Sequence, residues 1–163
     1  MKPVAPVRRT LKQDTLAQRP DARRVELSSN RSATLFSAKL WAYARYSGFA
    51  MGAALVGVDR RTTRGVLVEN VSLGLSMCAE RVALFTAVTE AIAPALLAVC
   101  APRTGGQLTF PCGACLQVAL EVAGGELVVV AADPDGAHEA VTLASLLPRA
   151  PKRHTPVLGT GAR

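Results

Sequence analysis

The residues of this sequence best suited to chemistry are its four cysteines, Cys78, Cys100, Cys112 and Cys115. Cys112 and Cys115 belong to the run Pro-Cys-Gly-Ala-Cys, which opens a segment of helical character. Two residues spaced by three on a helix point the same way, and the dipole at a helix N-terminus favours thiolates. The pair therefore fits a metal site, and redox-active dithiols share the same spacing.

A second motif, Cys78-Ala79-Glu80-Arg81, precedes the pair and also stands at the start of a helical segment. Residues spaced by two inside a helix face nearly opposite ways. If Cys78 and Glu80 act on one centre, Cys78 must therefore lie at the helix cap, before regular helix begins. Arg81, three positions after Cys78, can then reach back toward the sulfur atoms.

Three thiolates on Zn²⁺ leave a formal charge of −1, which two helix N-termini and Arg81 would offset. Three protein ligands also leave one position for water, which is the pattern of a catalytic zinc. The metal lowers the pKa of that water from ~15.7 toward ~7, which makes hydroxide available at neutral pH. Glu80 is then suited to take the proton from water and deliver it to a substrate.

The alternative is a zinc site that only stabilises the fold, or a buried cysteine beside an ordinary Cys-x-x-Cys pair. A structural tetrahedral site needs a fourth ligand. Neither His138 nor His154 lies in a motif, and Cys100 falls within an apolar run. Cys100 is accordingly predicted to be a small core residue rather than a ligand.

The elements that must position these residues follow from hydrophobic periodicity and turn residues. The predicted order is a helix from Ser32 to Ser47, strands at 53–58 and 65–69, a helix at 78–92, a strand at 95–101, a helix at 112–123, a strand at 127–132 and a helix at 142–147. This order predicts an α/β fold, a mixed sheet with helices on both faces. The helix at 78–92 is apolar nearly all round, so we expect it to be buried on most sides.

The net charge of +7 resides at the two ends of the 163-residue chain. Residues 1–31 contain eight Lys/Arg against three acidic residues, and residues 149–163 contain four Lys/Arg and no acidic residue, whereas residues 32–148 contain seven and nine. We therefore expect a basic, partly disordered or arm-like extension at 1–31, one folded domain at 32–148 and a basic tail at 149–163. Because the central part is slightly acidic and poor in aromatic residues, nucleic acid is not the expected partner.

The sequence has no run of 18 or more apolar residues free of charge and proline, and its basic N-terminus is not followed by an apolar segment. It therefore predicts no membrane span and no secretory signal, and a soluble, cytoplasmic protein.

Several blocks together resemble the small homotetrameric zinc-dependent cytidine deaminases over residues 32–148. The matching blocks, in chain order, are Ala42 to Leu55, Val68-Glu69-Asn70, Cys78 to Phe85, Pro111 to Val118 and, more weakly, Leu143 to Pro148. Zinc deaminases in general carry a ligand-x-Glu motif followed by Pro-Cys-x-x-Cys. The resemblance implies a three-layer α/β/α fold with a mixed five-stranded sheet.

The resemblance also assigns roles to individual residues. It implies that Cys78, Cys112 and Cys115 bind Zn²⁺ and that Glu80 moves protons while hydroxide attacks C4 of a cytosine-like ring, releasing ammonia. Arg81 would offset the thiolate charge. The implied substrate contacts are the backbone at Ala79 for the base, Phe49 in the base pocket and Glu69 on the sugar 3′-hydroxyl. The apolar helix at 81–92 would be the subunit-facing helix of a homotetramer.

The sequence departs from the family pattern at positions that concern the substrate. Leu67 stands where the family has an Asn that contacts the sugar, and a leucine cannot hydrogen-bond a ribose hydroxyl. The other departures are Val71, Leu73, Leu116 and the lack of an aromatic residue soon after Pro148. These changes make the expected pocket more apolar, and relatives such as the blasticidin S deaminases also replace the sugar-contacting Asn.

Three functions therefore stay open at this point. The first is hydrolytic deamination of cytidine or deoxycytidine in pyrimidine salvage. The second is deamination of a modified nucleoside or another aminated heterocycle, as in secondary metabolism. The third is a zinc-bound binding protein that has lost catalysis, against which the presence of Glu80 argues.

Overall fold

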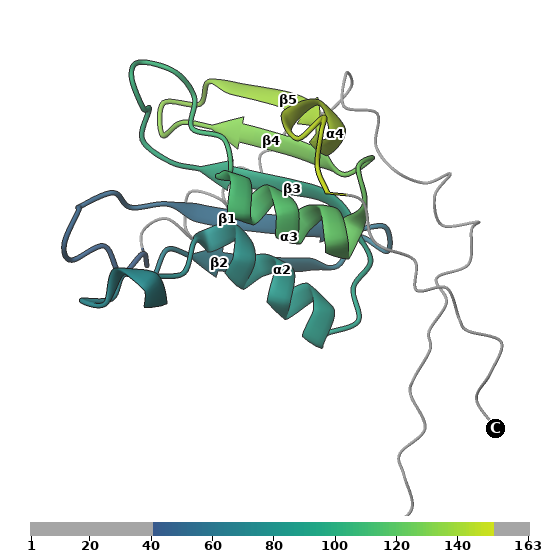
Figure 1. Cartoon of the computed structure of the whole chain (residues 1–163), viewed down its shortest axis with the longest axis horizontal. Coiled ribbons are helices and arrows are strands. Elements are labelled where there is room, and N and C mark those ends of the chain that lie inside the picture. The colour runs from purple at the N-terminus through teal and green to yellow at the C-terminus, as the bar shows by residue number, and fades with distance from the viewer. Residues whose placement is uncertain (1–40, 152–163) are drawn as a thin grey trace, which may run out of the picture.

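The structure is a computed structural model and describes residues 41–151. These residues form a five-stranded sheet in the order β2-β1-β3-β4-β5 (Figure 1). The strands are β1 (Gly52–Gly57), β2 (Thr62–Val66), β3 (Pro94–Cys100), β4 (Val128–Ala132) and β5 (His138–Thr142). Only β3 and β4 pair in parallel, and the other neighbours are antiparallel, so the sheet is mixed as predicted.

The central strands are the most apolar parts of the chain, and this explains their place in the sheet. Every residue of β1, β3 and β4 is buried. A strand buried on both faces reads as a continuous apolar run rather than an alternating one. The edge strand β2 alternates exposed and buried residues, and the edge strand β5 mixes exposed and partly buried ones.

The helices are α2 (Ala79–Thr89), α3 (Gly113–Ala123) and α4 (Leu143–Leu146), with a short 3₁₀ turn, η3 (Leu73–Leu75). Figure 1 shows α2 and α3 side by side across one face of the sheet. The main core lies between them and the sheet, and it includes Leu55, Leu84, Leu97, Ala119 and Val129. A second cluster of buried side chains, which includes Val56, Leu96 and Val130, lies on the opposite face of the sheet.

The first turns of α2 lie directly against β2. A Cβ atom at Gly65 would lie 2.1 Å from the Ala79 carbonyl oxygen and 2.6 Å from the Ala83 nitrogen. Only glycine allows two backbones to approach this closely. Two residues earlier on the same strand, the buried Thr63 hydroxyl donates a 2.8 Å hydrogen bond to the Ala83 carbonyl. These contacts fix where α2 begins relative to the sheet.

A short ladder joins three segments beside the start of α2. The Val68 and Met77 backbones exchange hydrogen bonds of 3.0 and 2.9 Å. On the other side, the Tyr43 nitrogen donates to the Leu67 carbonyl at 2.8 Å, and the Glu69 nitrogen donates to the Tyr43 carbonyl at 2.9 Å. The segment 67–69 therefore lies between residue 43 and the residue that immediately precedes Cys78.

The α/β class and the mixed five-stranded sheet are confirmed, but three local predictions are wrong and one strand was missed. β2 ends at Val66 rather than Glu69, and β5 was not predicted at all. The predicted helix at 32–47 is wrong over its described end, where Tyr43 pairs with Val68 and residues 45–47 form a turn. The expected burial of the helix at 78–92 is also wrong, because Phe85 and Val88 of α2 are 46% and 58% exposed.

The rest of the predicted helix, residues 32–40, lies outside the described residues, as does the predicted extension at 1–31. Of the predicted tail at 149–163, only residues 149–151 are described. Among residues 41–151, no helix is both long and apolar enough to cross a bilayer.

Candidate metal centre and active site

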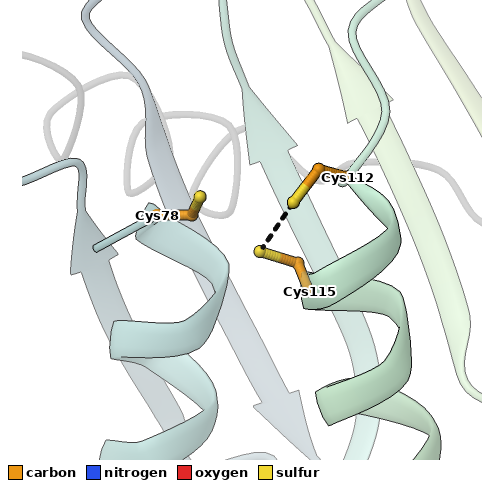
Figure 2. A group of neighbouring side chains, drawn as sticks. All are labelled: Cys78, Cys112 and Cys115. Carbon is orange, nitrogen blue, oxygen red and sulfur yellow. Dashed lines mark hydrogen bonds between the residues drawn. The ribbon is translucent and has the colours of Figure 1, made fainter. Parts of the chain in front are cut away.

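The thiols of Cys78, Cys112 and Cys115 meet between the N-termini of α2 and α3. Figure 2 shows Cys78 at the start of one helix and the other two at the start of its neighbour, with the sulfur atoms facing the gap between them. The three Sγ atoms all lie within 4.8 Å of one another. Sequence reasoning expected this group, and the fourth cysteine, Cys100, lies in β3 with its side chain fully buried.

The helix caps explain how the thiols converge. Cys78 and Cys112 are the N-caps of α2 and α3, and both have extended backbone angles. An extended N-cap residue turns its side chain toward the helix end instead of along the helical surface. Cys78 therefore precedes regular helix, as the presence of Glu80 two residues later requires. Cys115 lies one turn into α3 and is fully buried.

The donor set and its spacing fit Zn²⁺. Tetrahedral zinc with Zn–S bonds of ~2.3 Å places two thiolates about 3.8 Å apart, and the Cys112 and Cys115 sulfur atoms are 3.6 Å apart. The environment also favours a thiolate at Cys78, whereas the hydrogen bond that Cys115 makes to Cys78 raises the pKa of the Cys115 thiol. Hydrogen bonds from the Cys115 thiol and from Arg81 lower the pKa of Cys78 to about 5, against the opposing effect of burial.

Arg81 reaches back to the thiols from the first turn of α2. Its Nη2 atom lies 3.7 Å from the Cys78 sulfur, which is the contact that the spacing of three predicted. Its Nε atom is buried without a hydrogen-bond partner among the described residues. A guanidinium at this place offsets part of the negative charge that three thiolates bring together.

The Glu80 side chain lies next to the thiols, and the residue is only 1% exposed. Burial raises the pKa of its carboxyl group to about 7, and the nearby Cys78 thiolate also raises it, whereas a hydrogen bond from Cys115 opposes the shift. The Oε2 atom is buried with no hydrogen-bond partner in the part of the chain that the structure describes. A buried carboxylate oxygen left without a partner is costly and calls for a functional explanation. A carboxyl group whose pKa is near neutrality can both accept and return a proton.

The other predicted site residues lie on α2, on the segment 67–69 and after the turn at 45–47. Ala79 is its first residue and is fully buried. Leu67 and Glu69 lie on the segment that pairs with Met77. Phe49 follows the turn at 45–47, and its side chain, like that of Leu67, packs against the main core.

Two of the departures from the family pattern lie at the surface. Val71 and Leu73 are 80% and 81% exposed, so they do not enclose a pocket within one chain. Leu116, next to the third cysteine, is buried in the main core. Of these three apolar residues, Val71 and Leu73 therefore belong to the surface, and Leu116 belongs to the core.

Sequence reasoning missed three residues that organise the site. Gly65 and Thr63 hold α2 against β2, and the Ser47 hydroxyl donates to the Glu69 carboxylate. The glycine within a β-rich run was the available signal, because an isolated glycine in a strand marks a close backbone approach. Nothing in the local pattern pointed to Ser47, since its partner lies twenty-two residues away.

Comparison with known proteins agrees with this geometry. Residues 28–131 match the family model described as the cytidine and deoxycytidylate deaminase zinc-binding region. This chain belongs to that family. It is therefore a zinc-dependent hydrolytic deaminase, and the three thiols fit the zinc cofactor.

Similar proteins carry the same description. The cytidine deaminase of Halalkalibacterium halodurans is 38% identical over 109 residues, which cover 67% of this chain and 82% of that protein. That of Mycobacterium tuberculosis is 44% identical over 88 residues, or 54% of this chain and 65% of the other. The crystal structure of cytidine deaminase from Burkholderia pseudomallei superposes with a TM-score of 0.68 at 40% identity, covering 72% of this chain and 94% of that one.

Proposed function

We propose that this protein converts cytidine and deoxycytidine to uridine and deoxyuridine with release of ammonia. The observation that carries the proposal is the Oε2 atom of Glu80, which is buried and unpartnered beside three convergent thiols. A zinc site that only stabilised the fold would have no use for such a carboxylate. The same observation argues against a binding protein that has lost catalysis.

Cys78, Cys112 and Cys115 would hold the metal, and Zn²⁺ bound there makes hydroxide available near neutral pH. In the net reaction one water adds to C4 of the base, the bond from C4 to the exocyclic nitrogen breaks, and ammonia leaves. Glu80 accepts a first proton from the water and passes it to the ring nitrogen next to C4, and then accepts the second proton from the new C4 hydroxyl and passes it to the leaving nitrogen. Arg81 offsets part of the negative charge of the thiolates. The thiolates then reduce the Lewis acidity of the bound metal less than they would without this guanidinium.

The substrate would lie over the start of α2. Its base contacts the Ala79 backbone and the Phe49 ring, and its sugar 3′-hydroxyl donates to Glu69. Support comes from the ladder that joins segment 67–69 to Met77, which brings Glu69 close in the fold to Cys78. Leu67 stands where the family has an Asn, so one sugar hydrogen bond is absent.

The second candidate substrate is a modified nucleoside or another aminated heterocycle. Leu67 favours it, because its side chain packs into the core and offers no donor or acceptor to a ribose hydroxyl. A substrate with an altered sugar would lose nothing from that replacement, whereas cytidine would lose affinity by roughly tenfold or more.

We also propose that the protein assembles as a homotetramer through α2. Phe85 and Val88 form an exposed apolar face on this helix. Apolar side chains exposed together typically mark a protein interface, and the resemblance assigns this helix to the contact between subunits. The catalytic domain would span residues 32–148, and the place of action would be the cytoplasm, in pyrimidine salvage.

The test is ammonia release by zinc-loaded protein on cytidine, deoxycytidine, free cytosine and blasticidin S. We expect turnover of cytidine and deoxycytidine, and loss of that turnover in Glu80→Gln. Activity on blasticidin S with none on cytidine would identify the specialised reaction instead. Zinc-loaded protein that is inactive on every compound would contradict both and leave the binding protein.

A further inference from the structure

The turn formed by residues 45–47 is built around the carboxylate of Glu69. The backbone nitrogens of Tyr46 and Ser47 donate to Oε2 at 2.7 and 3.3 Å. The Ser47 hydroxyl donates a short hydrogen bond to Oε1. Both oxygens are thus held by a segment twenty-two or twenty-three residues away in the sequence. These donors lower the pKa of Glu69, so the group is a carboxylate at neutral pH.

The direction of the Ser47 hydroxyl is itself fixed. Its oxygen accepts a 3.0 Å hydrogen bond from the Phe49 nitrogen, so its own proton is free to point at Glu69. Ser47 therefore joins Phe49 and Glu69, the residues proposed to contact the base and the sugar. One hydroxyl thus contacts the backbone of Phe49 and the carboxylate of Glu69.

The Glu69 carboxylate keeps one hydrogen-bond acceptor position that a ligand can use. An ionised carboxylate has about four lone-pair positions. The turn occupies three of them, two on Oε2 and one on Oε1. One acceptor position on Oε1 is left among the described contacts, beside the Ser47 hydroxyl. A carboxylate that is already held by three donors loses little freedom when it accepts a further one.

The place of this carboxylate is fixed by backbone pairing as well. Glu69 donates its own nitrogen to the Tyr43 carbonyl, and its neighbour Val68 pairs with Met77, next to Cys78. Hydrogen bonds consequently connect the turn and the carboxylate to Met77, the residue that precedes the first thiol. A side-chain contact within the turn can therefore act on a substrate at the metal centre.

We propose that Ser47 is a positioning residue that orients Glu69 to accept the sugar 3′-hydroxyl, and that it thereby selects nucleosides that have this hydroxyl. The inference rests on the proposed function, since it assumes that Glu69 contacts the sugar. Ser47 would thus determine the selectivity for the 3′-hydroxyl, although it does not itself touch the reacting atoms.

The experiment compares kcat/KM for cytidine and 3′-deoxycytidine in zinc-loaded protein. The variants are Ser47→Ala, which removes the hydroxyl, and Ser47→Thr, which keeps it. Ser145→Ala is the matched control, because Ser145 is also exposed and its hydroxyl also donates a hydrogen bond, to the Thr142 carbonyl at the start of α4. Thermal unfolding of each variant checks that the fold is intact.

We expect the wild type to prefer cytidine by at least roughly tenfold, because a site built to bond a hydroxyl rejects an analogue that lacks it. Ser47→Ala should lose about tenfold on cytidine, mainly through KM, with little change on 3′-deoxycytidine. Ser47→Thr should restore the preference, and Ser145→Ala should leave it unchanged.

Two results would overturn this inference while the proposed function stands. One is an equal loss on both nucleosides in Ser47→Ala, which would mean that Ser47 only stabilises the turn. The other is a wild type that turns over both nucleosides equally well. Failure of the wild type to deaminate cytidine at all would instead overturn the proposed function, and this inference with it.

Discussion

Gly65→Ala should displace the catalytic helix without replacing any side chain that takes part in the reaction. The added Cβ would lie 2.1 Å from the Ala79 carbonyl oxygen, 2.6 Å from the Ala83 nitrogen and 2.9 Å from the Val82 Cβ. The two closest of these atoms are helix backbone, so no side-chain rotation relieves the clash. Restoring normal van der Waals separation requires α2 to move away from β2 by roughly 1 Å.

Two effects of this displacement can be measured. Overpacking of this kind costs about 1–3 kcal/mol of folding free energy, which lowers Tm by about 3–9 °C in a chain of this size. The helix also carries Cys78, whereas the other two thiols are carried by α3. Metal–ligand distances tolerate only ~0.2 Å, and a 1 Å error in placement can cost about 100-fold in rate. We therefore expect weaker zinc binding and slower turnover together.

The assay combines thermal unfolding, zinc competition against a chelating dye, and cytidine turnover measured well below Tm. Gly74→Ala is the matched control, because a Cβ at Gly74 would meet nothing within 4 Å. We expect the control to resemble the wild type in all three measurements. If Gly65→Ala does so as well, the contact between β2 and α2 does not position the metal centre and the reasoning is refuted.

The remaining predictions concern the thiols, the sheet contact, the sugar and the subunit interface. Cys115→Ser should lose zinc and stability together, whereas Cys100→Ser should keep full zinc stoichiometry by metal analysis; loss of metal in the latter would mean that the ligands are misassigned. Thr63→Val removes the buried hydrogen bond to α2 and should cost about 1 kcal/mol in denaturant unfolding; no change would mean that the bond contributes nothing. Leu67→Asn should improve cytidine kcat/KM by up to roughly tenfold, and no gain would point to a substrate without an ordinary ribose. If the proposed tetramer forms through α2, Phe85→Glu should yield smaller species in light scattering, and an unchanged mass would place the interface elsewhere.

The chemistry of this site was predictable from the sequence because its spacing is local. Cys112 and Cys115 share one helical turn, and the requirement that Cys78 and Glu80 serve one centre predicted the N-cap position that Cys78 occupies. The contact from Arg81 to Cys78 followed from a spacing of three. The closeness of the two motifs, however, depends on α2 and α3 packing side by side on the sheet, and it came from the family resemblance rather than from spacing.

The missed features all depend on partners that are distant in the sequence. β2 turns Thr63 and Gly65 toward α2, so its buried face carries no hydrophobic pattern that could mark it as a strand. β5 is a half-exposed edge strand whose order comes from pairing with β4. Apolar spacing around Tyr43 predicted a helix, but the backbone there pairs with Val68 instead.

Hydrophobicity also fails to distinguish a core from a surface that meets another molecule. The run at 78–92 predicted a helix buried on most sides, whereas Phe85 and Val88 are exposed on the single chain. Both observations agree if a second subunit covers this face. A hydrophobic pattern indicates that one face of a helix favours an apolar environment. It does not indicate whether the same chain or another molecule provides that environment.

The central claim is that Glu80 moves protons at a zinc centre held by three thiols. The most direct measurement is zinc content and cytidine turnover determined on the same preparations of wild type and Glu80→Gln. The account predicts one zinc per chain in both proteins and a loss of kcat in the variant of at least 100- to 10,000-fold, the range typical of general acid–base catalysis. Turnover within a few-fold of the wild type, with zinc retained, would contradict the role of Glu80 and the mechanism built on it.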